Sequence, residues 1–381
     1  MSQDSASHEV PSATALNLVR GLLSDATAMA RSGLASPADI DTAMRLGAGH
    51  PVGPLAFLRG LAPEVRARHD LAEPPAGSAV GDRTEEGTEA GAWNHAVGVA
   101  GTGTMASGIT EGMVRAGVPT VVLARSRGSA DRLVSAVTRS MDAAVAKGRL
   151  ATSDRDGALS LLGTTMRPDD LAGCGHVIEA VAEHRDTKRE LLARLDEALP
   201  AATVLATNTS SLTVGEIRAD LPERRTVIAL HFFNPAKAMK LVEVVGAGQD
   251  TTVLDTACAW VRRIGKVPVR CGDERGFVVN RLLIPYLNDA VRALDSGAFT
   301  VVEADALMRR ALGHPMGPFE LIDLIGTDVT AAAQSMLYEA SGDPRLEPAD
   351  GLLRLVAEGR LGRKSGTGFH DHTTPSSRST A

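Results

Sequence analysis

Residues 97–108, VGVAGTGTMASG, constrain the fold more than any other segment, because they lead a short apolar run directly into a glycine-rich turn. In the spacing G-x-G-x-x-G/A, the first glycine makes the tight turn and the second lets the backbone approach a pyrophosphate. The small third residue lets the next helix pack on the strand, and the N-terminus of that helix attracts phosphate groups. A second apolar strand is expected at 120–124, at the separation that such a unit requires. The segment therefore predicts a dinucleotide-binding site, formed by Gly101, Gly103, Thr104, Met105 and Ala106.

The end of the second strand distinguishes between the two nicotinamide cofactors. An NAD site usually has Asp or Glu there, and its carboxylate accepts hydrogen bonds from the ribose hydroxyls. This chain reads VVLARSR, which puts Arg125 at that position with no acid beside it. A guanidinium offers the hydroxyls no acceptor, but it pairs well with a 2′-phosphate. We therefore favour NADP(H) over NAD(H); the alternative is that Arg125 lies in solvent and the cofactor is NAD(H).

Composition limits the classes of partner and compartment. The 381 residues are 44% hydrophobic and carry a formal net charge of −6, so the chain can bury two cores. The negative charge argues against nucleic acid or an anionic membrane as the main partner. The three cysteines are too few and too scattered for a disulfide framework or a zinc site, and no metal is expected. The chain begins without a signal-peptide pattern and has no apolar run of membrane-spanning length, which predicts a cytoplasmic protein.

The apolar pattern divides the chain into successive regions. Short strands alternate with helices in the middle of the chain, which predicts a doubly wound α/β domain, and only helical patterns follow it. The strands are expected at 97–100, 120–124, 177–180, 203–207, 226–230 and 241–245. The later helices are expected at 277–295, 301–311, 317–338 and 350–358. The expected organisation is a disordered start at 1–14, a helical segment at 15–62, a flexible linker at 63–93, the α/β domain at 94–275, an all-helical domain at 276–371 and a disordered tail at 372–381.

The N-terminal helical segment repeats part of the C-terminal helical domain. Residues 16–61 align without a gap on 280–325, a shift of 264 positions. The turn GHPVGP at 49–54 then falls on GHPMGP at 313–318. An apolar stripe on a helix must be buried against another surface. We therefore expect the segment to pack on the C-terminal helical domain and to imitate a second copy of it.

Polar side chains stand where a plain α/β core would not need them. Asn208 and Ser210 follow one strand in the segment NTSSL, at an edge of the sheet where ligands bind. His231 and Asn234 end the next strand in HFFNP, and Glu243 is an acid inside the apolar strand LVEVV. A carboxylate beside an imidazole fixes its tautomer and raises its basicity, so the pair can take a proton from an alcohol. Each residue alone has a structural explanation, but together, beside a dinucleotide site, they indicate an acid/base pair.

Seven segments in a fixed order resemble the 3-hydroxyacyl-CoA dehydrogenases. They lie within 95–371 and read GTGTMASGI, VIEAVAEHRDTKRELLARLD, ATNTSSL, HFFNPAKAMKLVEVV, FVVNRLLIPYLNDA, LGHPMGPFELIDLIG and GRLGRKSGTGF. The resemblance implies a Rossmann-type domain followed by an all-helical domain that commonly forms a dimer contact. A homodimer or an intrachain pseudo-dimer through residues 15–62 is therefore expected. The implied reaction is the reversible oxidation of an L-3-hydroxyacyl thioester to the 3-oxoacyl thioester, as in fatty acid metabolism.

The resemblance also implies roles for individual residues. His231 is implied to be the acid/base and Glu243 its orienting partner, while Ser210 and Asn280 hydrogen-bond the reacting oxygen. The N-terminal copy has Leu16 in the place of Asn280, so it is expected to add packing and not chemistry. The residues implied to lie near the nicotinamide and its ribose are Glu183, Lys188, Asn208, Asn234 and Lys364. Those implied to hold the coenzyme A moiety are Ser140 and Lys147, on a helix expected at 129–148.

The chain departs from the family pattern at several positions. Arg125 replaces the ribose-binding Asp, so the family's preference for NAD does not transfer. Arg275 stands where the family usually has proline, and Lys237 puts a cation into a stretch that is usually apolar. Lys237 either adapts the acyl pocket to a polar or acidic acyl group or points at solvent, which is the interpretation that we favour.

Three functions are consistent with the sequence, and the first is preferred. The chain is an NAD(P)-dependent dehydrogenase acting on a free coenzyme A thioester, or a biosynthetic NADPH-dependent reductase acting on a carrier-protein thioester. Arg125 and the additional N-terminal segment favour the reductase. The third is a non-catalytic nucleotide-binding protein. The intact set of Ser210, His231, Glu243 and Asn280 argues against it, because a degenerate copy loses such residues first.

Overall fold

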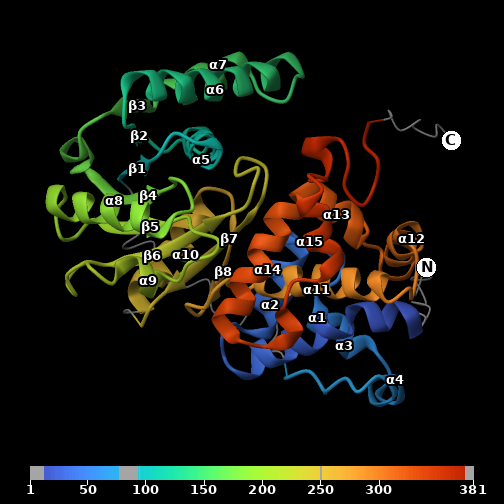
Figure 1. Cartoon of the computed structure of the whole chain (residues 1–381). Coiled ribbons are helices and arrows are strands. Elements are labelled where there is room, and N and C mark those ends of the chain that lie inside the picture. The colour runs from blue at the N-terminus through green and yellow to red at the C-terminus, as the bar shows by residue number, and fades with distance from the viewer. Residues whose placement is uncertain (1–12, 77–92, 94, 249–250, 374–381) are drawn as a thin grey trace, which may run out of the picture. The chain divides into compact units, whose positions relative to one another are not determined.

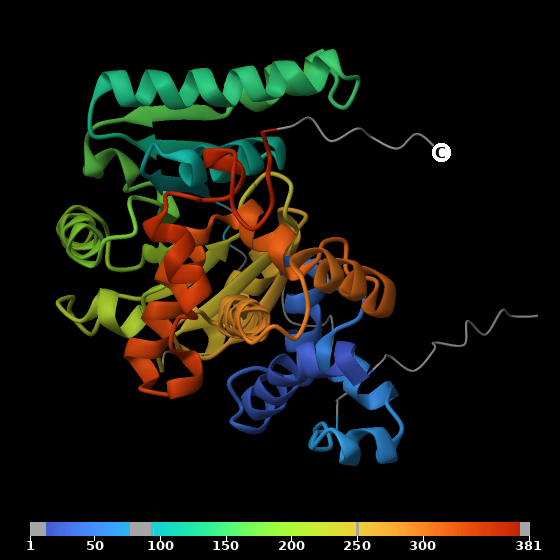
Figure 2. The ribbon, with the colours of Figure 1, turned by 45° about the vertical axis from the view of Figure 1, so that its right-hand side comes forward.

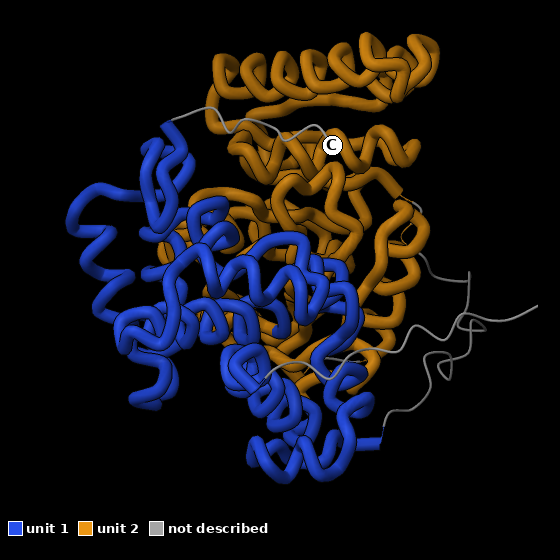
Figure 3. Tube along the Cα trace, turned by 90° about the vertical axis from the view of Figure 1, so that its right-hand side faces the viewer, with its two compact units in different colours: residues 1–33, 40–77, 278–381 blue, residues 34–39, 78–277 orange. Residues whose placement is uncertain are grey.

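The computed structural model describes residues 13–76, 93, 95–248 and 251–373, which form two compact units (Figure 3). The sheet unit takes its described residues from 34–39 and 78–277. The helical unit takes them from 1–33, 40–77 and 278–381. Most of the two predicted disordered ends lies outside the described residues, although the first helix already begins at Ala13.

The sheet unit is built on one sheet with the strand order β3-β2-β1-β4-β5-β6-β7-β8 (Figure 1). Neighbouring strands are parallel except β6 and β7, which are antiparallel. This arrangement, followed by the helices of the C-terminal region, confirms the predicted fold class. The strands are β1 (Ala96–Ala100), β2 (Thr120–Leu123), β3 (Leu162–Thr165), β4 (Cys174–Glu179), β5 (Val204–Thr207), β6 (Val227–Phe232), β7 (Leu241–Gly246) and β8 (Val267–Cys271).

The sequence prediction missed the two strands at the ends of this order, β3 and β8. The first reads LGTT, whose small and polar residues give no apolar run. The second reads VPVRC, and a proline inside a run argues against a strand because it cannot donate a ladder hydrogen bond. Each is an edge strand of the described sheet, paired there with one neighbouring strand, and the edge of a sheet tolerates such sequences.

Helices cover the sheet because strands of a parallel sheet are buried on both faces. α5 packs against β1 and β2, and α10 packs against β7 and β8. The core between sheet and helices includes the fully buried Trp260 of α10. The helices of this unit are α5 (Thr104–Arg115), α6 (Arg127–Ala146), α7 (Thr152–Ser160), α8 (Arg185–Ala198), α9 (Val214–Arg218) and α10 (Thr251–Arg263).

The helical unit joins the two ends of the described chain, blue and orange to red in Figure 2. The helix predicted at 317–338 is in fact two helices, because Gly326 at φ +112° ends α13 and α14 follows at once. None of the helices in the described ranges is long and apolar enough to cross a membrane. The N-terminal helices are α1 (Ala13–Arg31), α2 (Pro37–Gly47), α3 (Pro54–Gly60) and α4 (Pro63–Arg68). The C-terminal helices are α11 (Val279–Asp295), α12 (Val301–Leu312), α13 (Pro318–Ile325), α14 (Thr327–Ser341) and α15 (Asp350–Ala357).

The two copies of the sequence repeat have the same local structure. With the shift of 264 positions, α1, α2 and α3 correspond to α11, α12 and α13. In the N-terminal copy, Asp41 accepts a hydrogen bond from the backbone N–H of Leu55 at 2.8 Å. In the C-terminal copy, Asp305 accepts one from the N–H of Phe319 at 2.9 Å. Within the helical unit, α1 packs directly against α11.

The predicted flexible linker, 63–93, begins too early. Residues 63–68 form α4, which has proline at its first position and is held by Arg66, whose guanidinium donates to the carbonyls of Leu58 and Leu61. At the other end, Trp93 is buried and stacks on His176 at a ring-centroid distance of 4.1 Å. The Pro/Gly/Glu/Ala composition concealed both features, and residues 77–92 lie outside the described residues.

Two histidines from equivalent positions of the repeat meet inside the helical unit. The rings of His50 and His314 stack with centroids 4.1 Å apart, and Tyr286 lies edge-on to both at 6.3 Å. Burial, with a smaller contribution from His314, lowers the pKa of His50 to about 3. Burial lowers the pKa of His314 to about 4. Both imidazoles are therefore neutral near pH 7.

Acid is expected to destabilise the chain through this histidine pair. The folded pKa values lie below the ordinary 6.5, so below that pH the unfolded chain binds more protons, and stability falls as the pH drops. At pH 5 the loss is about 2 kcal/mol for each histidine. The double variant His50→Phe/His314→Phe keeps two stacked rings. Urea unfolding at pH 7 and pH 5 should show a smaller loss for this variant than for the wild type.

The matched control for this experiment is His95→Phe, because His95 is an exposed histidine of the sheet unit. The control should lose as much stability on acidification as the wild type. If the double variant also matched the wild type, the stacked pair would not be a source of the acid sensitivity.

Candidate active site

The glycine-rich turn between β1 and α5 has the geometry that a pyrophosphate needs. Gly101 has φ +136°, and a Cβ there would lie 2.4 Å from the carbonyl oxygen of Ala180, so only glycine fits. A Cβ at Gly103, the N-cap of α5, would meet no other protein atom within 4 Å. Ala106 is fully buried beneath the turn. The N-terminus of a twelve-residue helix, with Thr104 exposed at its first position, is therefore open to a phosphate group.

Arg125 lies just beyond β2, in the loop that leads into α6. Its side chain is exposed, and within the described part of the chain it makes no hydrogen bond or ion pair. Ser126 follows as the N-cap of α6 and accepts a hydrogen bond from the N–H of Ser129. The guanidinium is therefore available to an anion at the strand end, where the ribose of a dinucleotide is expected.

The structure brings His231 and Glu243 together. They are direct partners across the antiparallel strands β6 and β7, and Nδ1 of His231 lies 2.6 Å from a carboxylate oxygen of Glu243. Glu243 is fully buried, and His231 is 5% exposed. The rings of Phe233 and Phe277 lie 4.4 Å and 5.7 Å from the imidazole. Because Nδ1 is bound to the carboxylate, Nε2 is the ring nitrogen that a substrate would meet.

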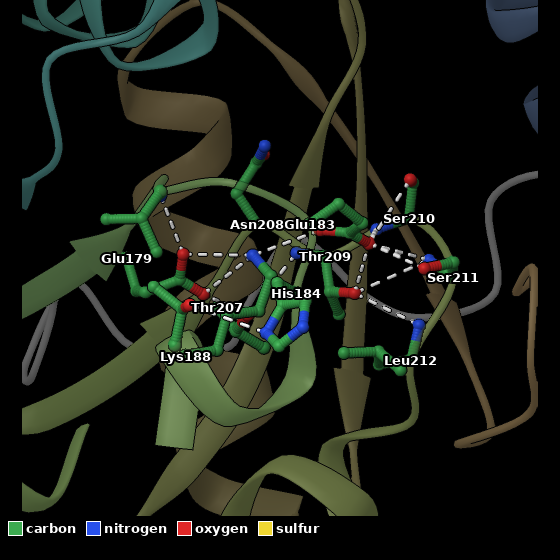
Figure 4. A network of polar contacts seen from close by, with 12 residues as sticks. Glu179, Glu183, His184, Lys188, Thr207, Asn208, Thr209, Ser210, Ser211 and Leu212 are labelled. Atoms are coloured by element: carbon green, nitrogen blue, oxygen red, sulfur yellow. Dashed lines mark hydrogen bonds and ion pairs between the residues drawn. The ribbon is translucent and has the colours of Figure 1, made fainter. Parts of the chain in front are cut away.

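Glu183 holds the loop that carries Ser210 (Figure 4). One of its carboxylate oxygens accepts hydrogen bonds from the backbone N–H groups of Ser210 at 2.8 Å and Ser211 at 3.0 Å, and from the hydroxyl of Thr209 at 2.6 Å. Burial alone raises the pKa of Glu183, but Lys188 and these donors outweigh it and bring the pKa to about 2. The NTSSL loop is thus wrapped around an ionised carboxylate.

A buried ion pair anchors Glu183 in turn. The ammonium of Lys188 lies 2.9 Å from Glu179 and 3.0 Å from the second oxygen of Glu183. Glu179, at the end of β4, is fully buried and also accepts a hydrogen bond from the hydroxyl of Thr207 at 2.7 Å (Figure 4). Since Lys188 is only 1% exposed, it bridges two carboxylates inside the protein. Its described contacts therefore connect it to the Ser210 loop through Glu183.

Two asparagines lie near the ends of neighbouring strands. Asn208 follows β5, and its side-chain oxygen accepts a hydrogen bond from the N–H of Phe232 at 2.8 Å, which ties β5 to β6. Asn234 follows β6, is exposed and precedes Pro235 through a cis peptide bond. Both are therefore at the carboxyl edge of the parallel strands, where ligands bind in open sheets.

The residues predicted to hold coenzyme A lie on or beside α6. Ser140 is half-buried and Lys147, the C-cap of the helix, is exposed. Lys237 is exposed, in keeping with the interpretation that we favoured, but its ammonium also has protein partners. Its ammonium contacts the hydroxyl of Ser140 and lies 3.5 Å from the buried carboxylate of Glu111. A buried carboxylate attracts a cation, which explains the orientation of this exposed lysine.

Two predicted site residues belong to the helical unit. Asn280 is half-buried in the first turn of α11. Lys364 forms an ion pair with Asp328 at 2.6 Å. Their predicted roles at the reacting oxygen and at the cofactor remain predictions.

Sequence reasoning missed several residues that shape the site. Glu179 has the same signal as Glu243, an acid in an otherwise apolar strand, and could have been found by it. Thr209 and Ser211 share the carboxylate of Glu183 with Ser210, which no sequence spacing reveals. Arg275, singled out only as a departure from the family, donates to the carbonyl of Ser211 and pairs with Glu216.

Comparison with known proteins finds similar domains and relatives. The family model of the 3-hydroxyacyl-CoA dehydrogenase NAD binding domain matches residues 96–274, and that of the 3-hydroxyacyl-CoA dehydrogenase C-terminal domain matches 17–69 and 276–372. A 3-hydroxybutyryl-CoA dehydrogenase of Mycobacterium tuberculosis is 40% identical over 288 residues, with 72% of this chain and 98% of the relative covered. A 3-hydroxyadipyl-CoA dehydrogenase of Escherichia coli is 38% identical over 277 residues, with 72% and 58% covered.

A solved structure with the same architecture gives a similar result. The crystal structure of (S)-3-hydroxybutyryl-CoA dehydrogenase from Ralstonia eutropha matches with a TM-score of 0.71 and 34% identity. The match covers 74% of this chain and 99% of that one.

Proposed function

The chain belongs to the 3-hydroxyacyl-CoA dehydrogenase family of NAD-binding oxidoreductases, and we propose that it acts on a short, uncharged 3-hydroxyacyl-CoA with NADP(H) as its preferred cofactor. The observation that carries the proposal is the buried pair of His231 and Glu243 at a distance of 2.6 Å. A buried carboxylate needs a partner, and an imidazole bound through Nδ1 is oriented for proton transfer at Nε2.

His231 serves as the acid/base. In the oxidation direction, Nε2 takes the proton of the substrate hydroxyl as its O–H bond breaks, and Glu243 stabilises the imidazolium that forms. The nicotinamide ring, when bound, supplies the acceptor for the hydride that leaves C3 of the substrate. In the reduction direction, the imidazolium returns its proton to the oxygen. The rings of Phe233 and Phe277 beside the imidazole keep water away from this transfer.

Ser210 and Asn280 are proposed to hydrogen-bond the reacting oxygen. The loop of Ser210 is fixed by Glu183, so this hydroxyl is positioned before substrate arrives. Lys188 acts as a positioning residue, because it holds Glu183 from inside the protein. Asn208 and Asn234, which follow β5 and β6, are proposed to contact the nicotinamide and its ribose together with Glu183 and Lys188. Lys364 is proposed to contact the cofactor as well.

Arg125 supports the cofactor preference. The turn of Gly101 and Gly103 accepts a pyrophosphate at the N-terminus of α5, and the same geometry suits NAD(H) and NADP(H). The residue at the end of β2 is therefore the one that discriminates between NAD(H) and NADP(H). Arg125 there is exposed and makes no ion pair in the described residues, so it favours the 2′-phosphate over a bare hydroxyl.

Lys237 supports the choice of an uncharged acyl group. The relatives described above are named for a four-carbon acyl group and for one with a second carboxylate. The ammonium of Lys237 already has two partners, the hydroxyl of Ser140 and the carboxylate of Glu111, which Arg115 shares, so we propose that it is not offered to an acidic acyl chain. Ser140 and Lys147 are then proposed to hold the coenzyme A moiety from α6, with Lys147 paired to a phosphate.

The test is a steady-state assay of the purified chain with acetoacetyl-CoA, 3-oxoadipyl-CoA and free acetoacetate, each with NADPH and with NADH. We expect acetoacetyl-CoA to be reduced with the highest kcat/KM, and NADPH to be preferred. A faster reaction with the acidic thioester would refute the acyl assignment, and no reaction with either thioester would refute the proposed function. A preference for NADH would refute the role of Arg125.

A further inference from the structure

The two copies of the repeat contact each other reciprocally. A Cβ on Gly49 would lie 3.3 Å from the ring of Pro315, and one on Gly313 would lie 3.4 Å from the ring of Pro51. If each residue is replaced by its equivalent in the other copy, 264 positions away, the contact of Gly49 with Pro315 becomes the contact of Gly313 with Pro51. The stacked pair of His50 and His314 is unchanged by the same replacement. A contact set that maps onto itself in this way is the signature of an isologous, two-fold interface, which joins the same surface of two subunits. Here both surfaces belong to one chain.

The two central helices of this interface approach closely and are strongly apolar. A Cβ on Gly21 of α1 would lie 2.2 Å from a carboxylate oxygen of Asp289 on α11, so a larger residue there must displace this carboxylate, which pairs with Arg345. The buried residues of α11 cover nearly its whole circumference: Val279, Leu282, Leu283, Ile284, Pro285, Tyr286, Leu287, Asn288, Ala290 and Val291. α11 packs against α14 and α15 as well as α1. Removing α1 would therefore leave an apolar face of α11 in water.

The charges at the interface show where the symmetry is broken. Asp25 and Asp289 are equivalent residues, and both pair with Arg345, at the distances of an ion pair. Arg345 comes from the part of the C-terminal domain that follows α14, beyond the stretch that the repeat shares. One guanidinium thus serves two carboxylates, and burial together with Asp25 raises the pKa of Asp289 to about 6 although Arg345 opposes it. Two complete C-terminal domains would supply two such arginines for two aspartates.

We propose that the N-terminal copy, 15–62, occupies within the same chain a self-association surface of the C-terminal helical domain, so that the protein is a monomer carrying its own pseudo-dimer. The surface, made by α11 and the turn around His314, is complementary to α1 and the turn around His50. The two copies of the repeat are related in sequence. If the N-terminal copy is displaced, the surface that it leaves on the C-terminal domain is therefore expected to bind a second molecule of this chain. The fused copy keeps this second molecule out.

The test is the mass in solution, measured by sedimentation on the full chain and on a variant that opens the interface. The wild type should sediment as a monomer of 39.7 kDa at micromolar concentration. Gly21→Leu favours the helix by propensity but collides with Asp289, so it should displace α1 and give a species of twice that mass. Ser24→Leu, on an exposed position of the same helix, is the matched control and should stay monomeric.

A milder pair of variants tests the contact even if Gly21→Leu does not fold. Gly21→Ala should lower the melting temperature by several degrees, and adding Asp289→Ala should restore it, because the second change removes the atom in collision. A dimeric wild type would overturn the proposal. So would a Gly21→Leu variant that remains monomeric with an unchanged melting temperature, or a Gly21→Ala loss that Asp289→Ala does not relieve.

Discussion

Replacing His231 with glutamine is expected to lower kcat for reduction of acetoacetyl-CoA by about 10²–10⁴-fold, the contribution of a positioned acid/base. Glutamine retains a side-chain hydrogen-bonding group near Glu243, but it cannot carry the proton that the reacting oxygen gains or loses. The effect belongs to the transition state, so the affinity for the cofactor, measured by fluorescence titration, should change little. The turnover number follows from the rate of nicotinamide oxidation under saturating substrate.

His95→Gln is the matched control for this substitution. His95 is exposed beside the start of β1, at the opposite end of that strand from the glycine turn, and should tolerate glutamine with kcat unchanged. A His231→Gln enzyme that kept near-native turnover would show that another group moves the proton. A loss of cofactor binding as large as the loss of turnover would show that His231 holds the site together instead.

Arg125→Asp is expected to reverse the cofactor preference. The substitution removes a charge-assisted pair with the 2′-phosphate, which is worth about 1.5–3 kcal/mol, or roughly 10- to 150-fold in affinity. It also supplies the carboxylate that accepts hydrogen bonds from the ribose hydroxyls of NAD(H). The Kd of NADPH should therefore rise more than tenfold while that of NADH falls. Binding titrations of both cofactors on wild type and variant measure the change directly.

Arg224→Asp provides a control of equal charge change. Arg224 is exposed and lies 3.5 Å from Asp196, away from the end of β2. Its replacement should leave both cofactor affinities near their wild-type values. If Arg125→Asp weakened NADPH and NADH equally, Arg125 would contribute general electrostatic attraction and no discrimination between the cofactors.

Local patterns were sufficient to predict most of the sheet unit. The strands with uninterrupted apolar runs, such as VGVA and TVIAL, appear within one or two residues of the expected bounds. The predicted strand bounds put the glycine turn, Asn208 and His231 at the ends of strands. Because parallel strands have their carboxyl ends at the same edge of a sheet, these residues were expected at one edge. The pairing of His231 with Glu243 was predicted from two residue types on successive strands, and the antiparallel register of β6 and β7 accounts for it.

Contacts between distant segments were not accessible in the same way. Lys188 is a residue of a charged helix by its sequence, yet it is fully buried because Glu179 and Glu183 lie on either side of it. Nothing local distinguishes this lysine from the exposed arginines of α8. The contacts of Lys237 were equally hard to predict, because its partners Glu111 and Ser140 lie far from it in the sequence, on α5 and α6. Long-range electrostatics decided both positions.

The most direct test of the central claim follows a single hydrogen atom. The purified chain is incubated with acetoacetyl-CoA and with NADPH or NADH deuterated at C4, in each of the two stereochemical forms. Mass spectrometry of the product is expected to show 3-hydroxybutyryl-CoA one mass unit heavier, with the label at C3, for one form of the cofactor. A hydroxyacyl product without the label from either form, or no such product, would contradict the assignment of this chain as a 3-hydroxyacyl-CoA dehydrogenase that works by hydride transfer.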